Sequence, residues 1–152
     1  MIRVEEPPFD VGAELGAFGR NDIAVGAVAS FVGYVRGTEA GAPLVALTLE
    51  HYPGMTERQL AAIEAEARTR WPLKDVLVIH RHGRMLPGEP IVLVAVSSAH
   101  RQAAFEACQF LMDWLKTKAP FWKLEETAEG TQWVDAKASD DDAADRWRKD
   151  AP

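Results

Sequence analysis

Cationic side chains gather in one stretch of this chain at spacings that suit anion chemistry. Lys116 falls in the last turn of an expected helix, and Lys123 follows seven residues later, beyond Pro120. Because a proline bends the chain between them, we expect the two ammonium groups to converge on one pocket. Converging lysines stabilise a developing anion, or one desolvated lysine serves as a base or nucleophile. The alternative is that Lys116 only complements its helix dipole, which leaves Lys123, between Trp122 and Leu124, without a reason.

Two further cationic groups lie at the ends of expected elements. His100 and Arg101 begin a helix directly after a buried strand, where free N–H groups and the helix dipole favour a phosphate or carboxylate. Arg36 ends another strand between Gly33 and Gly37, and glycines there permit a ligand to approach the backbone. In the alternative interpretation, His100 is a helix cap, Arg101 is a solvated side chain, and the glycines mark a bulge and a turn.

Other chemistries find less support. His80 and His82 alternate on one expected strand, but no third ligand stands at a recognisable spacing, so we expect no metal site. Cys108 lies in the apolar stripe of a helix and is expected to be a core residue rather than a nucleophile. The chain has neither a P-loop nor a GxGxxG motif, so ATP and dinucleotide chemistry are unsupported and no cofactor is expected.

The charge distribution favours a local anion site in an acidic protein. Seventeen Lys and Arg against 23 Asp and Glu give a net charge of −6, which disfavours general nucleic-acid binding. Between His80 and Lys123, however, six basic and three acidic side chains give +3, so the rest of the chain carries −9. The alternative is a scatter of solvated lysines and arginines.

Composition also bounds the compartment. The single cysteine excludes an internal disulfide and makes the cytosol the expected location. Acidic residues and two prolines at the N-terminus argue against a signal peptide. The least polar stretch, Ile23 to Val35, is too short to span a bilayer, so no membrane role is expected.

The elements that must position these residues follow from apolar periodicity and turn signals. We expect one domain over residues 1–152, with a charged tail from about residue 138. Strands are expected over Ile23–Arg36 (buried on both faces), Leu44–Glu50, Asp75–His82, Pro90–Ser98, Phe121–Glu126 and Thr131–Val134. Helices are expected over Asp10–Gly19, from a capping box of Thr56 and Gln59 to Pro72, over His100–Lys118, and in the tail around Trp147. This order predicts an α+β domain with mainly antiparallel strands.

The sequence also predicts one hairpin and one buried helix face in detail. Asp75–His82 and Pro90–Ser98 should form a hairpin, joined by a type II turn at Pro87 and Gly88. The buried stripe of the helix from His100 should consist of Ala104, Phe105, Cys108, Met112 and Leu115.

Five segments, in order along the chain, carry a resemblance to a known family. SFVGYVRG, LEHYPGMTE, HRHGRMLPGE, SSAHRQAAFEACQFLMDWLK and KAPFWKLE resemble the large, catalytic subunit of molybdopterin synthase, the MoaE family. The resemblance runs from about Ile23 to Lys137. It implies an α/β hammerhead fold with an added antiparallel β subdomain.

The resemblance also implies an activity and partners. Relatives are sulfurtransferases that convert cyclic pyranopterin monophosphate to molybdopterin in molybdenum cofactor biosynthesis. The two sulfurs come from the C-terminal thiocarboxylate of a small ubiquitin-like partner subunit of the MoaD type. A homodimer of this chain with one small subunit at each end, a heterotetramer, is implied as well.

Individual roles are implied by the matching positions. Lys116 and Lys123 match the two catalytic lysines. Substrate-binding segments match these lysines together with Tyr34, Val35, Arg36, His100, Arg101, Leu124 and Glu125. Phe31 and Met112 match apolar residues near the pocket, and Lys137 falls where relatives can carry an arginine that reaches a neighbouring subunit's site. Lysine keeps that charge but loses the planar fork of arginine.

Two functions of other classes are compatible with the residues. One is a noncatalytic module that binds the anionic C-terminal tail of a small protein, and the other is a phosphoester hydrolase. The hydrolase lacks an evident metal set or activated nucleophile. Converging Lys116 and Lys123 favour catalysis over the binding module, since a module that only binds an anion would more naturally use arginines.

Overall fold

A computed structural model describes residues 1–37, 42–134 and 138–148. Within these ranges the strands run over Ile2–Glu5 (β1), Ala27–Tyr34 (β2), Leu44–His51 (β3), Leu73–Arg81 (β4), Gly83–Met85 (β5), Pro90–Ser98 (β6), Phe121–Thr127 (β7) and Gly130–Val134 (β8). The helices run over Val11–Ala17 (α1), Met55–Arg70 (α2), Arg101–Thr117 (α3) and Ala138–Asp145 (α4). The predicted α+β class is confirmed.

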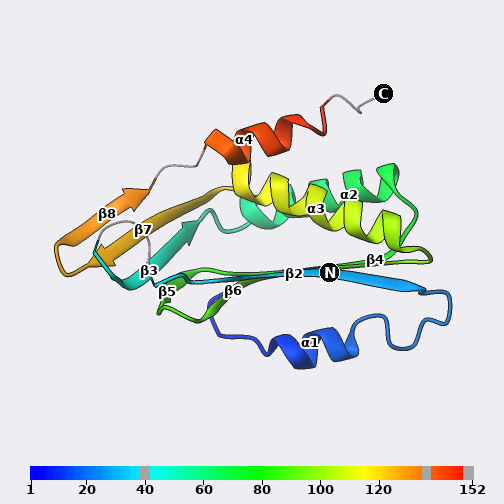
Figure 1. Ribbon diagram of the computed structural model, residues 1–152, viewed down its shortest axis with the longest axis horizontal. Coiled ribbons are helices and arrows are strands. Elements are labelled where there is room, and N and C mark those ends of the chain that lie inside the picture. Colours follow the sequence, from blue (N-terminus) through cyan, green and yellow to red (C-terminus); the bar gives the residue numbers. More distant parts are fainter. Residues whose placement is uncertain (38–41, 135–137, 149–152) are drawn as a thin grey trace.

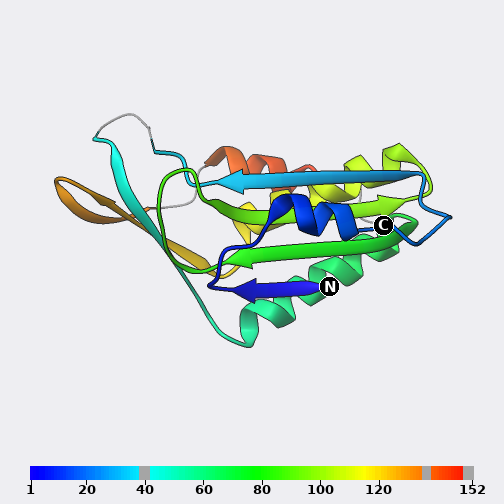
Figure 2. The ribbon, with the colours of Figure 1, turned by 90° about the horizontal axis from the view of Figure 1, so that it is seen from below.

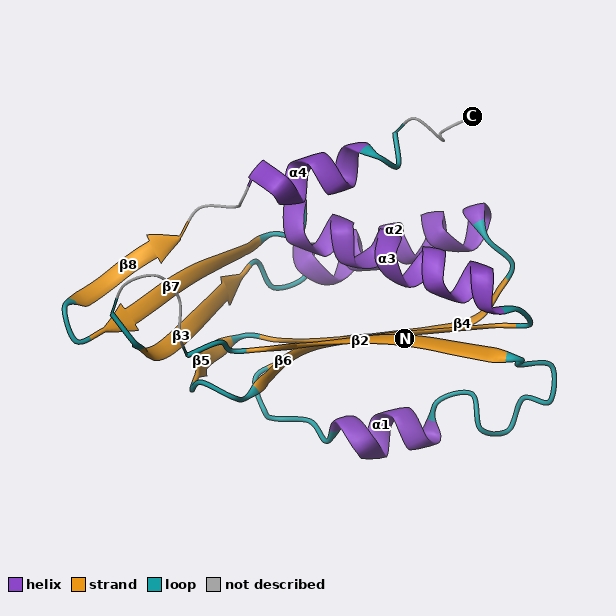
Figure 3. Cartoon of the chain, in the orientation of Figure 1, coloured by secondary structure: helices purple, strands orange, loops and turns teal. Residues whose placement is uncertain are grey.

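The strands form two four-stranded sheets, in the orders β1-β4-β6-β2 and β5-β3-β7-β8. Helices α2 and α3 cover one face of the first sheet and α1 covers the other, while the second sheet extends from one end (Figure 1). The same layers are visible by element type in Figure 3. Neighbouring strands are antiparallel except β1, which pairs parallel to β4 and was not expected from the sequence (Figure 2).

The core lies on both faces of β4 and β6. Alternate side chains such as Val76 and Val94 pack against α2 and α3, and their neighbours Leu77 and Leu93 belong to a second cluster that Leu15 of α1 contacts. Strands covered on both faces read as continuous apolar runs rather than alternating ones. This explains why the two strands are so evenly hydrophobic in the sequence.

The expected strand over Ile23–Arg36 is wrong at its N-terminal end and in its burial. The Asp22 carboxylate accepts a hydrogen bond from the Ala24 backbone N–H at 2.8 Å, which holds a turn there, and β2 begins only at Ala27. As an edge strand, β2 leaves Val28 and Tyr34 46% and 55% exposed.

The expected N-cap of α2 is also wrong. Gly54 occupies the cap at φ +83°, and its backbone N–H donates to Oε2 of Glu57 at 2.5 Å. Thr56 is instead fully buried, and its hydroxyl donates to the Tyr52 carbonyl at 2.8 Å. The capping box therefore starts two residues earlier than Thr56 and does not use Gln59.

The pairing of β4 with β6 confirms the predicted antiparallel pair, and the predicted turn is present, with Gly88 at φ +90° and a 3.1 Å bond from Glu89 N–H to the Leu86 carbonyl. The connection is not a simple hairpin, however, because β5 leaves the first sheet and pairs with β3. In α3 the predicted stripe is wrong at Phe105, which is 65% exposed.

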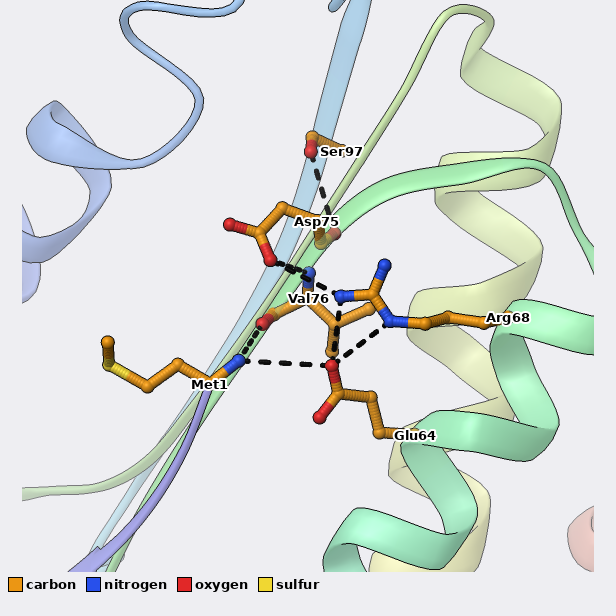
Figure 4. A network of polar contacts seen from close by, with 6 residues as sticks. All are labelled: Met1, Glu64, Arg68, Asp75, Val76 and Ser97. Carbon is orange, nitrogen blue, oxygen red and sulfur yellow. Dashed lines mark hydrogen bonds and ion pairs between the residues drawn. The ribbon is translucent and has the colours of Figure 1, made fainter.

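Polar contacts tie the N-terminus to the sheet (Figure 4). The Met1 ammonium donates to the Val76 carbonyl at 2.6 Å and lies 3.8 Å from the Glu64 carboxylate. Arg68 bridges Glu64, at 2.9 Å, and Asp75, at 3.3 Å. This network joins β1, α2 and β4.

The tail is anchored through Trp147. Its ring packs edge-on against Trp71 and Phe110, each at 5.5 Å, and its Nε1–H donates to Asp113 at 2.7 Å. The expected tail helix is present as α4 but ends at Asp145, so Trp147 packs from the turn that follows it. α4 lies over α3 on the side away from the first sheet (Figure 1).

Gly26→Ala should destabilise the fold by about 3 kcal/mol, because a Cβ at this position would stand 2.1 Å from the Ala99 carbonyl oxygen, a backbone atom that cannot move aside. Gly16→Ala is the matched control: nothing lies within 4 Å of its Cβ, and alanine favours helix α1 by up to about 1 kcal/mol. Urea unfolding at neutral pH measures both. Equal stability of the two variants would contradict the close approach.

Candidate functional site

A cavity of about 580 Å³ opens at the C-terminal end of α3, between the end of β2 and the second sheet. Eight of the residues singled out from the sequence line it: Phe31, Tyr34, Val35, Arg36, Met112, Lys116, Lys123 and Glu125. The rest of the lining is largely apolar and includes Leu47, Leu49 and Ile91. An apolar wall with a few charged groups is typical of a site for a small organic ligand.

Both lysines reach this cavity, from different elements. Lys116 lies in the last turn of α3, and Lys123 lies on β7, where it pairs with Leu49 of β3. β7 begins directly after Pro120 and pairs antiparallel with β3. This pairing brings the side chains of Lys116 and Lys123 to one cavity, as their spacing predicted. Because side chains alternate along a strand, Glu125 shares the cavity face with Lys123, whereas Leu124 points to the opposite face and does not line the cavity.

Arg36 reaches the cavity through an irregularity in β2. The register with β6 shifts between Gly33 and Tyr34, so the interpretation of Gly33 as the site of a bulge is confirmed. A Cβ on Gly33 would stand 2.8 Å from Val92. Beyond the bulge the chain leaves the ladder, and Val35, only 2% exposed, bonds through its backbone N–H to the Glu89 carbonyl at 2.9 Å.

His100 and Arg101 do not line the cavity. They stand at the N-terminal end of α3, fifteen residues before Lys116, which corresponds to about 22 Å along a helix. His100 occupies the cap position, but its side chain makes no capping hydrogen bond. Within one chain, therefore, the two ends of α3 do not meet at one site. Lys137 lies outside the described residues.

His80 lines the cavity but was not predicted as a site residue. In the sequence, its alternation with His82 indicates only a possible pair of metal ligands. Its ring stacks on Phe121 with centroids 3.8 Å apart, whereas His82 turns toward His51, 4.4 Å away. Within the described ranges no cluster of three metal-ligating side chains is present.

The protonation of His80 follows from its surroundings. Its Nδ1 lies 2.8 Å from the Arg81 carbonyl oxygen, which can only accept, so Nδ1 carries the hydrogen. Burial lowers the pKa of His80 to about 4, and the positive charge of Lys116 acts in the same direction. The imidazole is therefore neutral at physiological pH.

The electrostatic character of the cavity is cationic. Arg36, Lys116 and Lys123 face it, with Glu125 as the acidic side chain among its described lining residues. Cys108 is buried elsewhere in the core, and burial raises the pKa of its thiol to about 11. The chemistry that the cavity supports is thus binding and stabilisation of an anion rather than attack by a cysteine.

The helices of the described residues include none long and apolar enough to cross a membrane.

Comparison with known proteins shows the family of this chain. Residues 4–118 match the family model described as MoaE protein. The molybdopterin synthase catalytic subunit of Pseudomonas aeruginosa is 55% identical over 148 residues, which is 97% of this chain and 99% of the relative. The solved structure of the molybdopterin biosynthesis MoaE protein from Burkholderia ambifaria superposes with a TM-score of 0.83 at 49% identity, over 97% of both chains.

A more distant solved structure shares the fold. It is a complex of subunits 1 and 2 of the molybdopterin-converting factor from Helicobacter pylori, with a TM-score of 0.74 at 21% identity. The likeness covers 88% of this chain and 89% of that chain.

Acid should destabilise the protein partly through His80. The unfolded imidazole binds a proton near pH 6.5 and the folded one only near pH 4, so its contribution is present above pH 6.5 and is lost as the pH falls to 4. Urea unfolding of wild type and His80→Gln between pH 7 and pH 4 should show wild type losing about 3 kcal/mol more than the variant.

Carboxylates also titrate in this range, and the charges of Lys116, His51 and His82 act on His80. These contributions are common to both proteins and cancel in the difference between the two curves. Parallel curves would contradict the assignment of a buried, neutral His80.

Proposed function

Because this chain belongs to the MoaE family of molybdopterin synthase catalytic subunits, we propose that its cavity binds cyclic pyranopterin monophosphate and adds two sulfur atoms to it. The chain is an enzyme of molybdenum cofactor biosynthesis. The observation that carries the substrate assignment is the convergence of Arg36, Lys116 and Lys123 on one cavity with an apolar wall.

The two kinds of lining suit the two parts of the substrate. A cyclic phosphate is an anion that an arginine holds through paired hydrogen bonds, and the apolar wall of Leu47, Leu49 and Ile91 fits a flat ring system. Glu125 contributes a carboxylate that accepts hydrogen bonds from ring N–H groups. Tyr34 and Val35 belong to the same rim as Arg36.

Sulfur would arrive from a small ubiquitin-like partner whose C-terminus is a thiocarboxylate. Its sulfur attacks an oxygen-bearing side-chain carbon of the pterin, so that a C–S bond forms while a C–O bond of that carbon breaks, and the oxygen leaves with the opened cyclic phosphate or as water. A thioester then joins substrate and partner. Water then hydrolyses the thioester, releasing a carboxylate on the partner and a thiol on the pterin. A second partner molecule supplies the second sulfur in the same way.

Lys116 and Lys123 would serve this reaction by electrostatics. Negative charge develops on the carbonyl oxygen when water attacks the thioester and on sulfur when the acyl group leaves, and fixed ammonium groups stabilise both. The same positive potential attracts the anionic tail of the partner. Because sulfur is delivered from another chain, the burial of Cys108 is no obstacle.

The assembly we propose is a homodimer of this chain with a small subunit of the MoaD type at each end. A structure of the related fold contains subunits 1 and 2 of the molybdopterin-converting factor, which supports a heteromeric enzyme. In the fold terms used for the family, the first sheet with its helices is the α/β hammerhead, and β5-β3-β7-β8 is the added antiparallel subdomain.

The dimer also accounts for His100 and Arg101. These residues stand about 22 Å from Lys116 along α3 and are exposed there, so they can contact the phosphate only in the cavity of a second copy. Lys137 would act in the same manner, as a cation near a neighbouring site. Phe31, 40% exposed at the cavity, and Met112 would border the substrate.

Lys116→Ala should reduce dithiolene formation by at least about 100-fold, because it removes a charge placed at the developing anion. Lys118→Ala is the matched control: this side chain is also exposed at the end of α3 but does not line the cavity. The assay incubates the enzyme with thiocarboxylated small subunit and cyclic pyranopterin monophosphate and detects the dithiolene product.

Near-normal product from Lys116→Ala would overturn the catalytic assignment. No product from the folded wild-type enzyme would overturn the substrate assignment itself and favour a module that only binds the tail of its partner.

Mixing experiments test the site shared between copies. Lys116→Ala and Arg101→Ala should each be impaired alone, but a heterodimer of the two contains one site with both residues intact. Random re-assembly of the mixed variants should therefore restore about a quarter of the wild-type activity. If Arg101 acted in the cavity of its own chain, mixing would restore nothing.

A further inference from the structure

His80 lines the cavity but has no part in the function proposed above. It is 8% exposed and lies on β4, in the first sheet, while the cations of the cavity come from the segment after β2, from α3 and from β7. A buried, ionisable side chain at the wall of a reaction site is a candidate for a role in the reaction.

The orientation of the His80 ring is fixed on two sides. Its Nδ1–H donates to the Arg81 carbonyl at 2.8 Å, and its face stacks on Phe121 at 3.8 Å with planes 16° apart. Arg81 is itself immobilised: it is 4% exposed, and its Nε–H donates to the Glu6 carbonyl at 3.0 Å. The imidazole therefore has little freedom to turn.

The second ring nitrogen, Nε2, is an acceptor that opens to the cavity. With the hydrogen on Nδ1, the neutral ring carries a lone pair on Nε2. In the part of the chain that the structure describes, no enclosed side-chain nitrogen or oxygen lacks a hydrogen-bond partner. Since Nε2 bonds to no described residue, it must border open space, and the space that His80 borders is this cavity.

Lys116 is the cation of the cavity whose charge acts on this imidazole. Its side chain is exposed, and no carboxylate of the described residues pairs with it. We propose that His80 is a positioning residue for Lys116: when an anion occupies the cavity, the ammonium turns to Nε2, donates a hydrogen bond to it and is thereby held toward the substrate.

The choice of a neutral imidazole has a physical reason. A carboxylate at this place would orient the ammonium but cancel the positive charge that an anionic substrate needs. A protonated histidine would repel the ammonium and offer no acceptor. A buried histidine that stays neutral supplies direction without neutralising charge, so Lys116 is oriented and keeps its full electrostatic effect.

The inference rests on the proposed function, and two variants separate positioning from packing. His80→Phe keeps a ring that stacks on Phe121 but removes the acceptor. His80→Gln loses the ring but returns an acceptor near the position of Nε2. We expect His80→Phe to lower kcat about 10- to 100-fold with KM changed less than about 3-fold, and His80→Gln to recover most of the rate.

A double-mutant cycle supplies the second readout. In a Lys116→Ala background, His80→Phe should cause no further loss of single-turnover product, because the group that it orients is already absent. A wild-type rate for His80→Phe, a glutamine variant no better than the phenylalanine variant, or an undiminished effect without Lys116 would each overturn the proposal. Urea unfolding confirms that each variant is folded.

A measurement without the pterin keeps the two proposals apart. In ¹⁵N NMR, the Nε2 resonance of His80 reports whether that nitrogen accepts a hydrogen bond. On addition of inorganic phosphate as the anion, the resonance should shift in wild type and in the matched Lys118→Ala but not in Lys116→Ala. Equal responses of the two variants overturn the contact, even if the enzyme makes product; a shift that needs Lys116 supports it, even if the pterin assignment fails.

Discussion

Burial of β4 and β6 on both faces is the constraint on which the rest of the structure depends. Their side chains, among them Val78, Ile79, Leu93 and Val94, are almost completely excluded from water, and each buried side chain of this size contributes about 1.5–3 kcal/mol. Two faces must then be covered, by α2 and α3 on one side and by α1 on the other. In these layers α3 packs against β2 and β6.

The cavity lies where the first sheet and its helices end and the second sheet begins. The chain leaves the first sheet through β5 and after the bulge in β2, and builds a second sheet beside it. Side chains from both sheets and from the last turn of α3 meet at the junction, so residues far apart in the sequence, such as Arg36, His80 and Lys123, line one space. A junction between two rigid sheets positions charges more precisely than a loop would.

The same geometry limits which of the candidate residues one copy of the chain can bring together. One protomer brings Lys116 and Lys123 together but leaves His100 and Arg101 at the far end of a 17-residue helix. A stiff helix cannot fold these ends onto each other, because its length is fixed at about 1.5 Å per residue. The function that we propose therefore uses an assembly rather than the single chain, and His80 is among the groups that one protomer would supply to it.

Local pattern determined much of this protein by itself. Apolar periodicity indicated α1, α3 and every described strand except β1 and β5. The pair Pro87 and Gly88 indicated the turn before β6, and the spacing across Pro120 indicated that Lys116 and Lys123 converge on one cavity. Periodicity predicts such features because it records which face of an element avoids water. The resemblance to the MoaE family added the chemistry that we propose for these residues.

Tertiary structure alone decided the rest. Periodicity does not say which strand stands at an edge, so the exposure of β2 was mispredicted, and so was that of Phe105, which lies beyond the cover that the sheet gives α3. Apolar periodicity also does not indicate which distant segments pair, so the parallel pairing of β1 with β4 was not predicted. The place of His80 at the cavity is visible only in the folded chain, where its ring stacks on Phe121 of β7. A contact between such distant segments depends on packing rather than on spacing in the sequence.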